Sequence, residues 1–489
     1  MTRPDMLERL REAQTFDLLI IGGGATGMGC AVDAASRGYR TALIEQYDFG
    51  KGTSSRSTKL VHGGVRYLEQ GNLTLVMEAL KERGILRQNA PHLVSDLAFI
   101  VPNYEWWEAP FYGVGLRLYD LLAGKYGFGA SHNLNKEETL ARLPALKQDG
   151  LRGGVVYYDG QFDDARLLIH LALTAAAQGA VVVNYCPAVA LLKNSSGMVC
   201  GAAVRDSESG EEFEIAARGV INATGCFSDA VRRMTDAAAP PMIAPSQGAH
   251  LVFDGAFLRG DSAILVPHTA DGRVMFAIPW HGHTLVGTTD TPIDAVSPEP
   301  VPLAREIDFI LETAGRYLAR APQRADILSA WAGIRPLVKS RSGGTTASLS
   351  RDHSVHIDPN GLVTIAGGKW TTYRHMAEDC VDQAAMLAGL DERECVTKRL
   401  PIHRYEEPAG DFHAEVVRAA RNEMARRVED VLARRTRTLF LNAREALEKA
   451  PGVADLLAVE VGGDTGLAEF QRLAEGYLGG RGGANEPRA

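Results

Sequence analysis

One stretch near the N-terminus, residues 16–45 (FDLLIIGGGATGMGCAVDAASRGYRTALIE), constrains the fold more than any other. It opens with a short apolar run of the kind found in strands that are buried on both faces. Gly22, Gly24 and Gly27 follow as G-x-G-x-x-G, at the start of a helical segment. Glu45 ends the next apolar run, where βαβ folds place the acid that binds a ribose. The stretch therefore predicts a βαβ dinucleotide-binding unit.

Each part of this pattern has a chemical reason. Without a Cβ, Gly22 can make a tight turn, Gly24 lets a pyrophosphate approach the backbone, and Gly27 lets the helix pack against the strand. The start of the helix directs free N–H groups at the phosphates. Glu45 would accept hydrogen bonds from a ribose and repel a 2′-phosphate. FAD and NAD both carry an ADP half, but the position of the motif at the start of a long chain favours a flavoprotein.

Length, charge and cysteine usage exclude several protein classes. With 489 residues the chain can form two or three domains, and a net charge of −8 argues against general nucleic-acid binding. The N-terminus has no apolar segment typical of a secretory signal, and no apolar run reaches the ~18 residues of a membrane span. The six cysteines form no C-x-x-C pair, so we expect free thiols in a reducing compartment and no metal site or disulfide.

Residues 47–71 (YDFGKGTSSRSTKLVHGGVRYLEQG) contain too many glycines and hydroxyls for a helix. They predict a loop rich in hydrogen-bond donors that can hold a pyrophosphate or the edge of a flavin. Lys59, His62 and Arg66 lie in it, and a solvated loop with exposed cations is the alternative. We favour a functional role because Arg66 has apolar neighbours, where an idle charge is unfavourable.

The aromatic-rich segment 104–128 leaves two interpretations open. Its helical core could pack inside the protein, or it could present an exposed apolar face to a membrane or a lipid-soluble partner.

Further along, a buried strand at 218–225 ends in A-T-G, which permits a second close approach to the dinucleotide. Residues 240–345 then change to short strands, which predict a mostly antiparallel sheet forming the floor of a substrate pocket.

Two motifs complete the predicted site, and a basic segment follows them. WAGIRPL sets Arg335 in apolar surroundings, and residues 362–374 (LVTIAGGKWTTYR) form a strand, a glycine pair and a helix start. Such a helix start can point at the flavin edge where negative charge builds on reduction.

Seven arginines between 418 and 437 favour a solvated helix with i,i+4 pairs over a basic face for an anionic bilayer.

Taken together, these motifs resemble the FAD-dependent glycerol-3-phosphate dehydrogenases, within the broader class of D-amino-acid-oxidase-like flavoproteins. The matching stretches are IIGGGATGMGCAVDAASRG, TSSRSTKLVHGGVRYLEQG, DDARL, NATG, GTTD, AGIRPL, GGKWTTYR and RRVEDVLARRTR. The resemblance implies oxidation of sn-glycerol 3-phosphate to dihydroxyacetone phosphate, with electrons passed from reduced FAD to a membrane quinone. It also implies a peripheral protein on the cytoplasmic, inner face of the cell membrane, and leaves a homodimer open.

We therefore expect a mixed α/β fold with a Rossmann-like FAD-binding part, an inserted antiparallel substrate part and a helical C-terminal domain. The helical domain is expected to be shortened, because the region before RRVEDVLARRTR is shorter than in relatives. The expected boundaries are an oxidoreductase domain at 15–398, with an FAD part at about 15–100, 155–240 and 345–398, a substrate part at about 101–154 and 241–344, and a helical domain at 399–489.

The resemblance places the substrate site on His62, Arg66, Tyr67, Arg335, Lys369 and Arg374. A phosphate dianion needs several cations, and arginine offers a matching fork of donors. A neutral imidazole at His62 could remove the C2 hydroxyl proton near pH 7, and Lys369 could stabilise the developing charge. The expected cofactor contacts are Ile21, Gly22, Gly23, Gly24, Ala25, Thr26, Gly27, Glu45, Gln46, Thr53, Ser54, Ser55, Ser57, Lys59, His62, Gly63, Gly64, Ala188, Val189, Ala223, Thr224, Gly225, Gly368, Lys369, Thr371 and Thr372.

Three alternatives stay open at this point. A glycerol-3-phosphate oxidase would use O2 instead of a quinone. An amine or amino-acid oxidase of the same fold would bind a carboxylate, for which one arginine suffices, so the several cations argue against it. A flavin-binding scaffold without turnover is disfavoured by the complete set of candidate catalytic residues.

Overall fold

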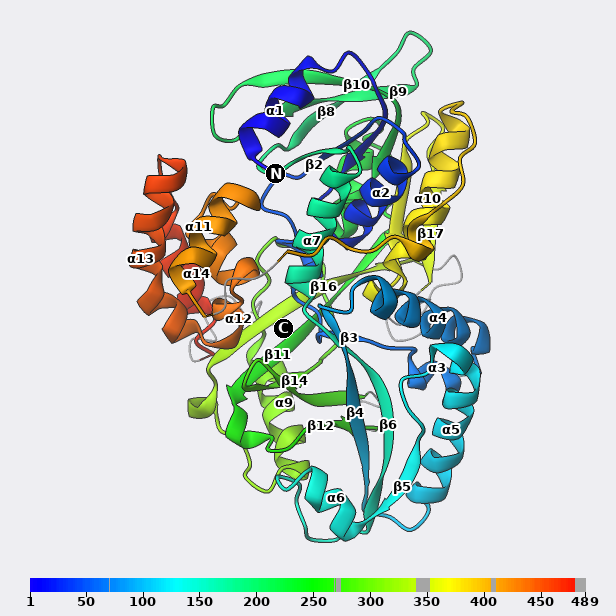
Figure 1. Ribbon diagram of the computed structural model, residues 1–489, viewed down its shortest axis with the longest axis vertical. Coiled ribbons are helices and arrows are strands. Elements are labelled where there is room, and N and C mark those ends of the chain that lie inside the picture. Colours follow the sequence, from blue (N-terminus) through cyan, green and yellow to red (C-terminus); the bar gives the residue numbers. More distant parts are fainter. Residues whose placement is uncertain (70, 268, 270–273, 340–351, 406–409, 480–489) are drawn as a thin grey trace.

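The computed structural model describes residues 1–69, 71–267, 269, 274–339, 352–405 and 410–479, apart from the side chains of Arg66 and Glu69. The chain folds into two β-sheets with helices around them and a helical domain at one side (Figure 1). The predicted mixed α/β class is confirmed.

The first sheet carries the dinucleotide fingerprint. Within the described residues it has eight strands: β1 (Phe16–Ile21), β2 (Thr41–Ile44), β7 (Val181–Val183), β8 (Ala188–Lys193), β9 (Val199–Arg205), β10 (Glu212–Asn222), β17 (His353–Ile357) and β18 (Val363–Gly367). Their order is β17-β18-β10-β1-β2-β7, while β9 pairs with the first half of β10 and β8 pairs with β9. β1 pairs in parallel with β2 and β10, as the fingerprint predicts.

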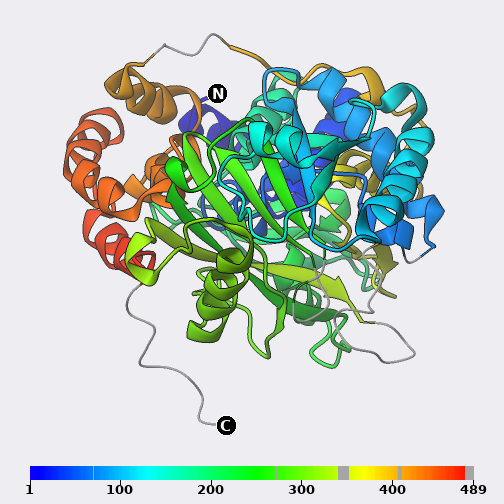
Figure 2. The same cartoon turned by 90° about the horizontal axis from the view of Figure 1, so that it is seen from below.

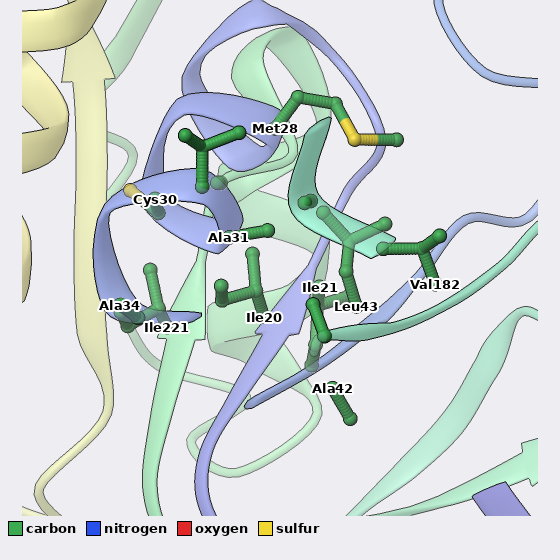
Figure 3. Close-up of a cluster of buried hydrophobic side chains, with 14 of the residues drawn as sticks. Ile20, Ile21, Met28, Cys30, Ala31, Ala34, Ala42, Leu43, Val182 and Ile221 are labelled. Atoms are coloured by element: carbon green, nitrogen blue, oxygen red, sulfur yellow. The ribbon is translucent and has the colours of Figure 1, made fainter. Parts of the chain in front are cut away.

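Helices cover this sheet, and one of them, α2, carries mostly small side chains. The helices of this layer are α1 (Arg3–Glu12), α2 (Ala25–Ser36), α7 (Asp164–Ala177), α8 (Ser228–Arg233) and α10 (Tyr373–Leu387). Figure 3 shows Cys30, Ala31 and Ala34 of α2 in one cluster with Ile20 and Leu43 of the strands, and all five are fully buried. Small residues on α2 let its backbone approach the sheet, which fixes the start of α2 relative to the end of β1.

The second sheet is mostly antiparallel, as expected for the substrate part. Its ten described strands are β3 (Leu60–Val61), β4 (Val94–Asn103), β5 (His132–Asn135), β6 (Gly153–Phe162), β11 (Ile243–Asp254), β12 (Ser262–Val266), β13 (Met275–Trp280), β14 (His283–Gly287), β15 (Thr291–Pro292) and β16 (Ser329–Val338). The main order is β15-β11-β14-β13-β12-β4-β6-β3, with β16 beside β11 and β5 beside β6. Among the described pairs, β12 and β4 run parallel and the others antiparallel.

The strands β3, β4 and β6 belong to the second sheet. They lie wholly or partly in segments 15–100 and 155–240, which we expect to form the FAD part, and that division stays a prediction. β4 and β6 pair along their full lengths, from Val94 opposite Phe162 to Asn103 opposite Gly153. A buried apolar strand has the same hydrophobic pattern in either sheet, so its sequence does not reveal which strand lies beside it.

The helices α3 (Val65–Glu69), α4 (Leu73–Asn89) and α5 (Glu108–Ala123) lie at one side of the second sheet (Figure 1). α6 (Lys136–Arg142) packs against β5 and β6, and α9 (Ala304–Tyr317) packs against β11. α5 answers the question left open for 104–128, because its inner residues Leu116, Tyr119 and Ala123 are buried while its outer face is exposed and apolar. The exposed side chains on or next to it are Trp106, Trp107, Phe111, Val114, Leu118 and Leu121.

The C-terminal helices pack beside both sheets, as Figures 1 and 2 show. They are α11 (Phe412–Asn422), the π-helical turn η8 (Asp430–Arg435), α12 (Thr438–Leu441), α13 (Ala443–Val461) and α14 (Leu467–Gly476). Leu432 and Phe440 share a hydrophobic core with Trp331 of β16. The predicted helical C-terminal domain is confirmed, but the stretch expected to be one helix breaks after Asn422, because Met424 has a left-handed backbone with φ of +57°.

The arginines of this domain overturn the expectation of a solvated helix. Arg434 and Arg435 are 1% and 0% exposed, and both form ion pairs with the buried Asp48. Arg426 and Arg421 pair with Glu208 and Glu460. These charges therefore face acids of the protein itself, and they form neither a solvated i,i+4 ladder nor a free basic face.

No helix in the described ranges is both long enough and apolar enough to cross a membrane.

Candidate active site

A cavity of about 510 Å³ lies between the two sheets. Its walls include the residues that follow β1, β2 and β10, so it occupies the crevice beyond the carboxyl ends of the parallel strands. The other walls come from β11, β13 and β16 of the second sheet. Its volume falls in the range of about 300–1,000 Å³ that ligand sites have.

The fingerprint residues shape one end of the cavity. Gly22 has φ of +114°, and a Cβ on Gly27 would lie 1.9 Å from the Gly22 carbonyl oxygen, so both positions require glycine. The Gly23 N–H donates to Glu45 Oε2 at 2.6 Å, and the Tyr47 N–H donates to Oε1 at 2.9 Å. Burial raises the pKa of Glu45, while these two donors act against the shift. The carboxylate is thereby held at the end of β2, where a ribose would lie.

The hydroxyl-rich loop completes this end. Ser54 Oγ accepts the Ala25 N–H at 2.9 Å, which sets the loop against the start of α2. The indole N–H of Trp370 donates to the Ser54 carbonyl at 2.8 Å. A Cβ on Gly22 would lie 2.6 Å from the carbonyl oxygen of Ala223, so the A-T-G segment lies against the glycine turn, and its contact with the dinucleotide stays a prediction.

Two cations of the cavity lining come from β16 and from the turn after β18. Arg335 Nη2 donates to the Thr289 carbonyl at 3.0 Å and to Thr288 Oγ1 at 3.2 Å, and Arg335 Nη1 lies 3.6 Å from Asp290. Lys369 Nζ lies 4.0 Å from the centre of the Tyr67 ring, a cation–π contact. Both cations line the cavity that the fingerprint also lines.

His62 also lines the cavity. Its backbone N–H donates to Thr371 Oγ1 at 3.2 Å, and its ring centre lies 6.4 Å from that of Phe276. The neighbouring Gly63 N–H donates to the Tyr119 hydroxyl at 2.8 Å, which ties this loop to α5. Arg66 lies in α3, but its side chain is outside the described part of the structure, so its role stays a prediction.

Two of the predicted cations do not reach the cavity. Lys59 is fully buried and donates to both carboxylate oxygens of Asp164 at 2.8 Å. Arg374 donates to both oxygens of Glu82 at 2.7 Å and to Glu378 at 2.8 Å. We correct both assignments, because each cation neutralises a carboxylate inside the protein and is directed away from a ligand.

The structure adds residues that the sequence did not single out. His250 is 2% exposed, its Nε2 lies 2.9 Å from Thr58 Oγ1, and its ring stacks on Trp331 with centres 4.3 Å apart. Burial, together with the charges of Arg335 and Lys59, holds the pKa of His250 well below its ordinary value, so the ring is neutral. In the sequence, His250 looks like an ordinary strand residue. The GTTD motif includes Thr288–Asp290 but does not indicate a role for them.

Most of the predicted contacts line the cavity. They are Ile21, Gly22, Gly24, Ala25, Thr26, Glu45, Gln46, Thr53, Ser54, Ser57, His62, Tyr67, Ala188, Ala223, Thr224, Gly225, Arg335, Gly368, Lys369 and Thr371. The remaining ones, apart from Lys59, Arg66 and Arg374, lie behind this lining: Gly23, Gly27, Ser55, Gly63, Gly64, Val189 and Thr372. Direct contact of each with a bound cofactor stays a prediction.

Comparison with known proteins agrees with this arrangement. Residues 17–374 match the family model of the FAD dependent oxidoreductases, and residues 371–466 match the C-terminal domain of alpha-glycerophosphate oxidase. The probable mitochondrial glycerol-3-phosphate dehydrogenase of Caenorhabditis elegans is 41% identical over 525 residues, covering 94% of this chain and 73% of that protein. The chain belongs to the FAD-dependent glycerol-3-phosphate dehydrogenase family.

Other members of the family support the same conclusion. The mitochondrial glycerol-3-phosphate dehydrogenase of Macaca fascicularis is 48% identical over 403 residues, which are 80% of this chain and 55% of that protein. The chain thus spans about half the length of this mammalian relative. A crystal structure of the glycerol-3-phosphate dehydrogenase from Bacillus halodurans, complexed with FAD, matches 97% of both chains with a TM-score of 0.79 and 27% identity.

FAD is the cofactor of this family, and the residues present fit it. The glycine turn and the start of α2 suit the pyrophosphate, and Glu45 suits the ribose. The flavin would extend from there toward the end of the cavity that Arg335, Lys369 and His62 line.

Proposed function

We propose that this protein oxidises sn-glycerol 3-phosphate to dihydroxyacetone phosphate and passes the electrons to a membrane quinone. One observation carries the first part of the proposal: the same cavity is lined by the dinucleotide fingerprint and by Arg335, Lys369 and His62. An anionic substrate would therefore sit beside the flavin.

Arg335 is our candidate for the phosphate group of the substrate. Its guanidinium is aligned by the Thr289 carbonyl and the Thr288 hydroxyl, so its fork of donors is oriented before a ligand arrives. Lys369 lies in the same cavity, and Arg66 stays a further candidate. A dianion recognised by several cations distinguishes this substrate from an amino acid, for which one arginine is enough.

Oxidation removes a hydride from C2 and a proton from the C2 hydroxyl. Bound FAD would accept the hydride. We assign the proton to a ring nitrogen of His62, because a neutral imidazole acts as a base near pH 7. Lys369 would stabilise negative charge on the substrate oxygen as that proton leaves.

The first experiment is to add glycerol 3-phosphate without oxygen to the protein loaded with FAD. We expect rapid loss of the ~450 nm flavin band, as for a flavin that accepts a hydride. Bleaching by an amino acid, and none by glycerol 3-phosphate, would remove the substrate and leave the fold assignment intact. His62→Asn should slow bleaching by about 10²–10⁴-fold, and a full rate would contradict its role as base.

The proposal of a membrane acceptor is supported by the outer face of α5. Trp107, Phe111, Val114, Leu118 and Leu121 follow one another at steps of three or four residues, and each is 42–76% exposed. Such a stripe is typical of a helix that lies in the surface of a bilayer, with tryptophans at the boundary. The opposite face of α5 touches the loop that carries His62, so the stripe lies on the side of the protein near the cavity.

Vesicle sedimentation tests this face. We expect the wild-type protein to pellet with lipid vesicles and Val114→Glu/Leu121→Glu to stay in solution, because two charges would have to enter the bilayer. Val459→Glu, which changes an 82% exposed residue of α13, is the matched control and should still pellet. If both variants pellet equally, α5 is not the membrane face.

Hydrogen peroxide formed in step with turnover in air would favour O2 over a quinone as the acceptor.

A further inference from the structure

The segment from Glu45 to Arg56 joins β2 to β3 and carries much of the cofactor end of the cavity, and we call it the cofactor loop. It contains the ribose carboxylate at its start and the hydroxyls of Thr53 and Ser54 near its end. Its regular structure is one short turn at Thr53–Ser55, and Gly50 and Gly52 lie inside it. A loop of this kind has little local structure to hold its shape, so contacts from outside must do so.

Asp48 is the main anchor of the cofactor loop. Its side chain is fully buried, and its oxygens accept hydrogen bonds from Arg434 Nε at 2.6 Å and from Arg435 Nη2 at 2.9 Å. Asn184 Nδ2 donates to it at 3.2 Å. The guanidinium groups hold the pKa of Asp48 below its usual value despite burial, so the carboxylate is charged.

The arginines that hold Asp48 belong to η8 of the C-terminal domain. Arg434 also donates to Glu429 at 2.7 Å and to Asp430 at 2.8 Å, and Arg435 donates to the Glu423 carbonyl at 2.7 Å. Each buried charge in this group therefore has partners of opposite sign. Removing one partner would leave an uncompensated charge in the interior.

Two further contacts join the C-terminal domain to the same loop. Lys51 Nζ lies 2.6 Å from Glu429 of the C-terminal domain and 3.0 Å from Glu299 of the second sheet's layer. Arg56 donates to the Tyr477 hydroxyl at 2.8 Å and to Glu299 at 2.6 Å. The cofactor loop is thus tied to the C-terminal helices at its beginning, middle and end.

We propose that the C-terminal helical domain positions the cofactor loop for FAD through the ion network centred on Asp48. In this arrangement the docked domain preorganises the FAD site, and bound FAD in turn stabilises the docking of the domain. Such coupling is reciprocal, because each event favours the same conformation of the loop. Asp48, Arg434 and Arg435 are positioning residues, since they act on FAD through the loop.

The test compares Asp48→Asn with Asp33→Asn, a matched control. Asp33 is 1% exposed, pairs with Arg37 and lies on the FAD-binding helix α2, toward the end away from the cavity. FAD is removed from each protein and its rebinding is followed by quenching of flavin fluorescence. We expect FAD to bind Asp48→Asn at least about tenfold more weakly and Asp33→Asn as tightly as wild type. Equal affinity in a folded Asp48→Asn would overturn the proposal.

Hydrogen exchange separates positioning from a general loss of stability. In wild type and in Asp33→Asn, FAD should slow amide exchange in residues 430–435, which lie outside the cavity. In Asp48→Asn this protection should be lost, whereas unchanged protection would contradict the coupling. If Asp48→Asn does not fold, Glu429→Gln takes its place, because that side chain is 17% exposed and holds Lys51. Wild-type affinity and protection in Glu429→Gln would then overturn the proposal.

Discussion

At the scale of single residues, charge alone did not distinguish ligand-binding cations from structural ones. Arg335 and Arg374 both lie in motifs from which the sequence predicts the substrate site, yet one lines the cavity and the other is held by Glu82. The difference lies in the partners. Arg335 donates to a backbone carbonyl and a threonine hydroxyl, with one carboxylate, Asp290, 3.6 Å away, whereas Arg374 donates to both oxygens of Glu82 and to Glu378.

Gly248 gives a residue-scale prediction for the substrate end. A Cβ there would lie 2.5 Å from Arg335 Nη2 and 2.6 Å from Thr288 Oγ1, so Gly248→Ala must displace the guanidinium. We expect KM for glycerol 3-phosphate to rise about tenfold or more while FAD binds as before. Steady-state kinetics and a flavin titration measure the two effects. Gly452→Ala, where a Cβ meets no atom within 4 Å, should change neither, and an unaltered KM in Gly248→Ala would separate Arg335 from substrate binding.

At the scale of elements, one helix sets the loop that aligns Arg335. Glu306, on the first turn of α9, is 2% exposed. Its Oε1 accepts from Thr289 Oγ1 at 2.8 Å and from Thr291 Oγ1 at 2.6 Å. Its Oε2 accepts from Gln247 Nε2 at 2.8 Å. Although α9 does not line the cavity, it therefore fixes the end of β14 and the GTTD motif through one carboxylate.

Glu306→Gln tests this arrangement. The amide nitrogen cannot accept the bonds that one carboxylate oxygen accepts, so one group of donors loses its acceptor in the interior. We expect the free energy of unfolding to fall by about 1–3 kcal/mol and kcat/KM to fall about tenfold, mainly through KM. Urea unfolding and kinetics provide the measurements. Glu312→Gln on the exposed side of the same helix serves as the control, and equal behaviour of the two variants would exclude a role for Glu306.

At the scale of the whole molecule, the active site is assembled from three layers. The first sheet supplies the dinucleotide end, the second sheet supplies Arg335 and His250, and the C-terminal helices hold the cofactor loop through Asp48. The helical domain also shares a hydrophobic core with β16, so it is continuous with the substrate layer. The C-terminal domain therefore contacts both the cofactor loop and a strand that carries Arg335.

The sequence by itself determined the dinucleotide unit, the mostly antiparallel second sheet, the helical C-terminal domain and the family. These follow from local patterns, because the strand, turn and helix of the fingerprint are adjacent in the chain and each glycine has a steric reason there. The same holds for the loop and strand motifs that bring His62, Arg335 and Lys369 to the cavity. These residues lie in short sequence segments, and such segments can be recognised whichever larger fold the chain adopts.

Only the tertiary structure decided which sheet β4 and β6 join and which charges pair. Arg374 meets Glu82 across 292 positions of the chain, and Arg434 meets Asp48 across 386. Periodicity reports which face of an element is buried but not what lies opposite, so a buried cation looks the same in sequence whether a ligand or a carboxylate neutralises it. The partner of each charge is fixed when distant elements pack together. This packing therefore decides which residues line the cavity and which ones stabilise its walls.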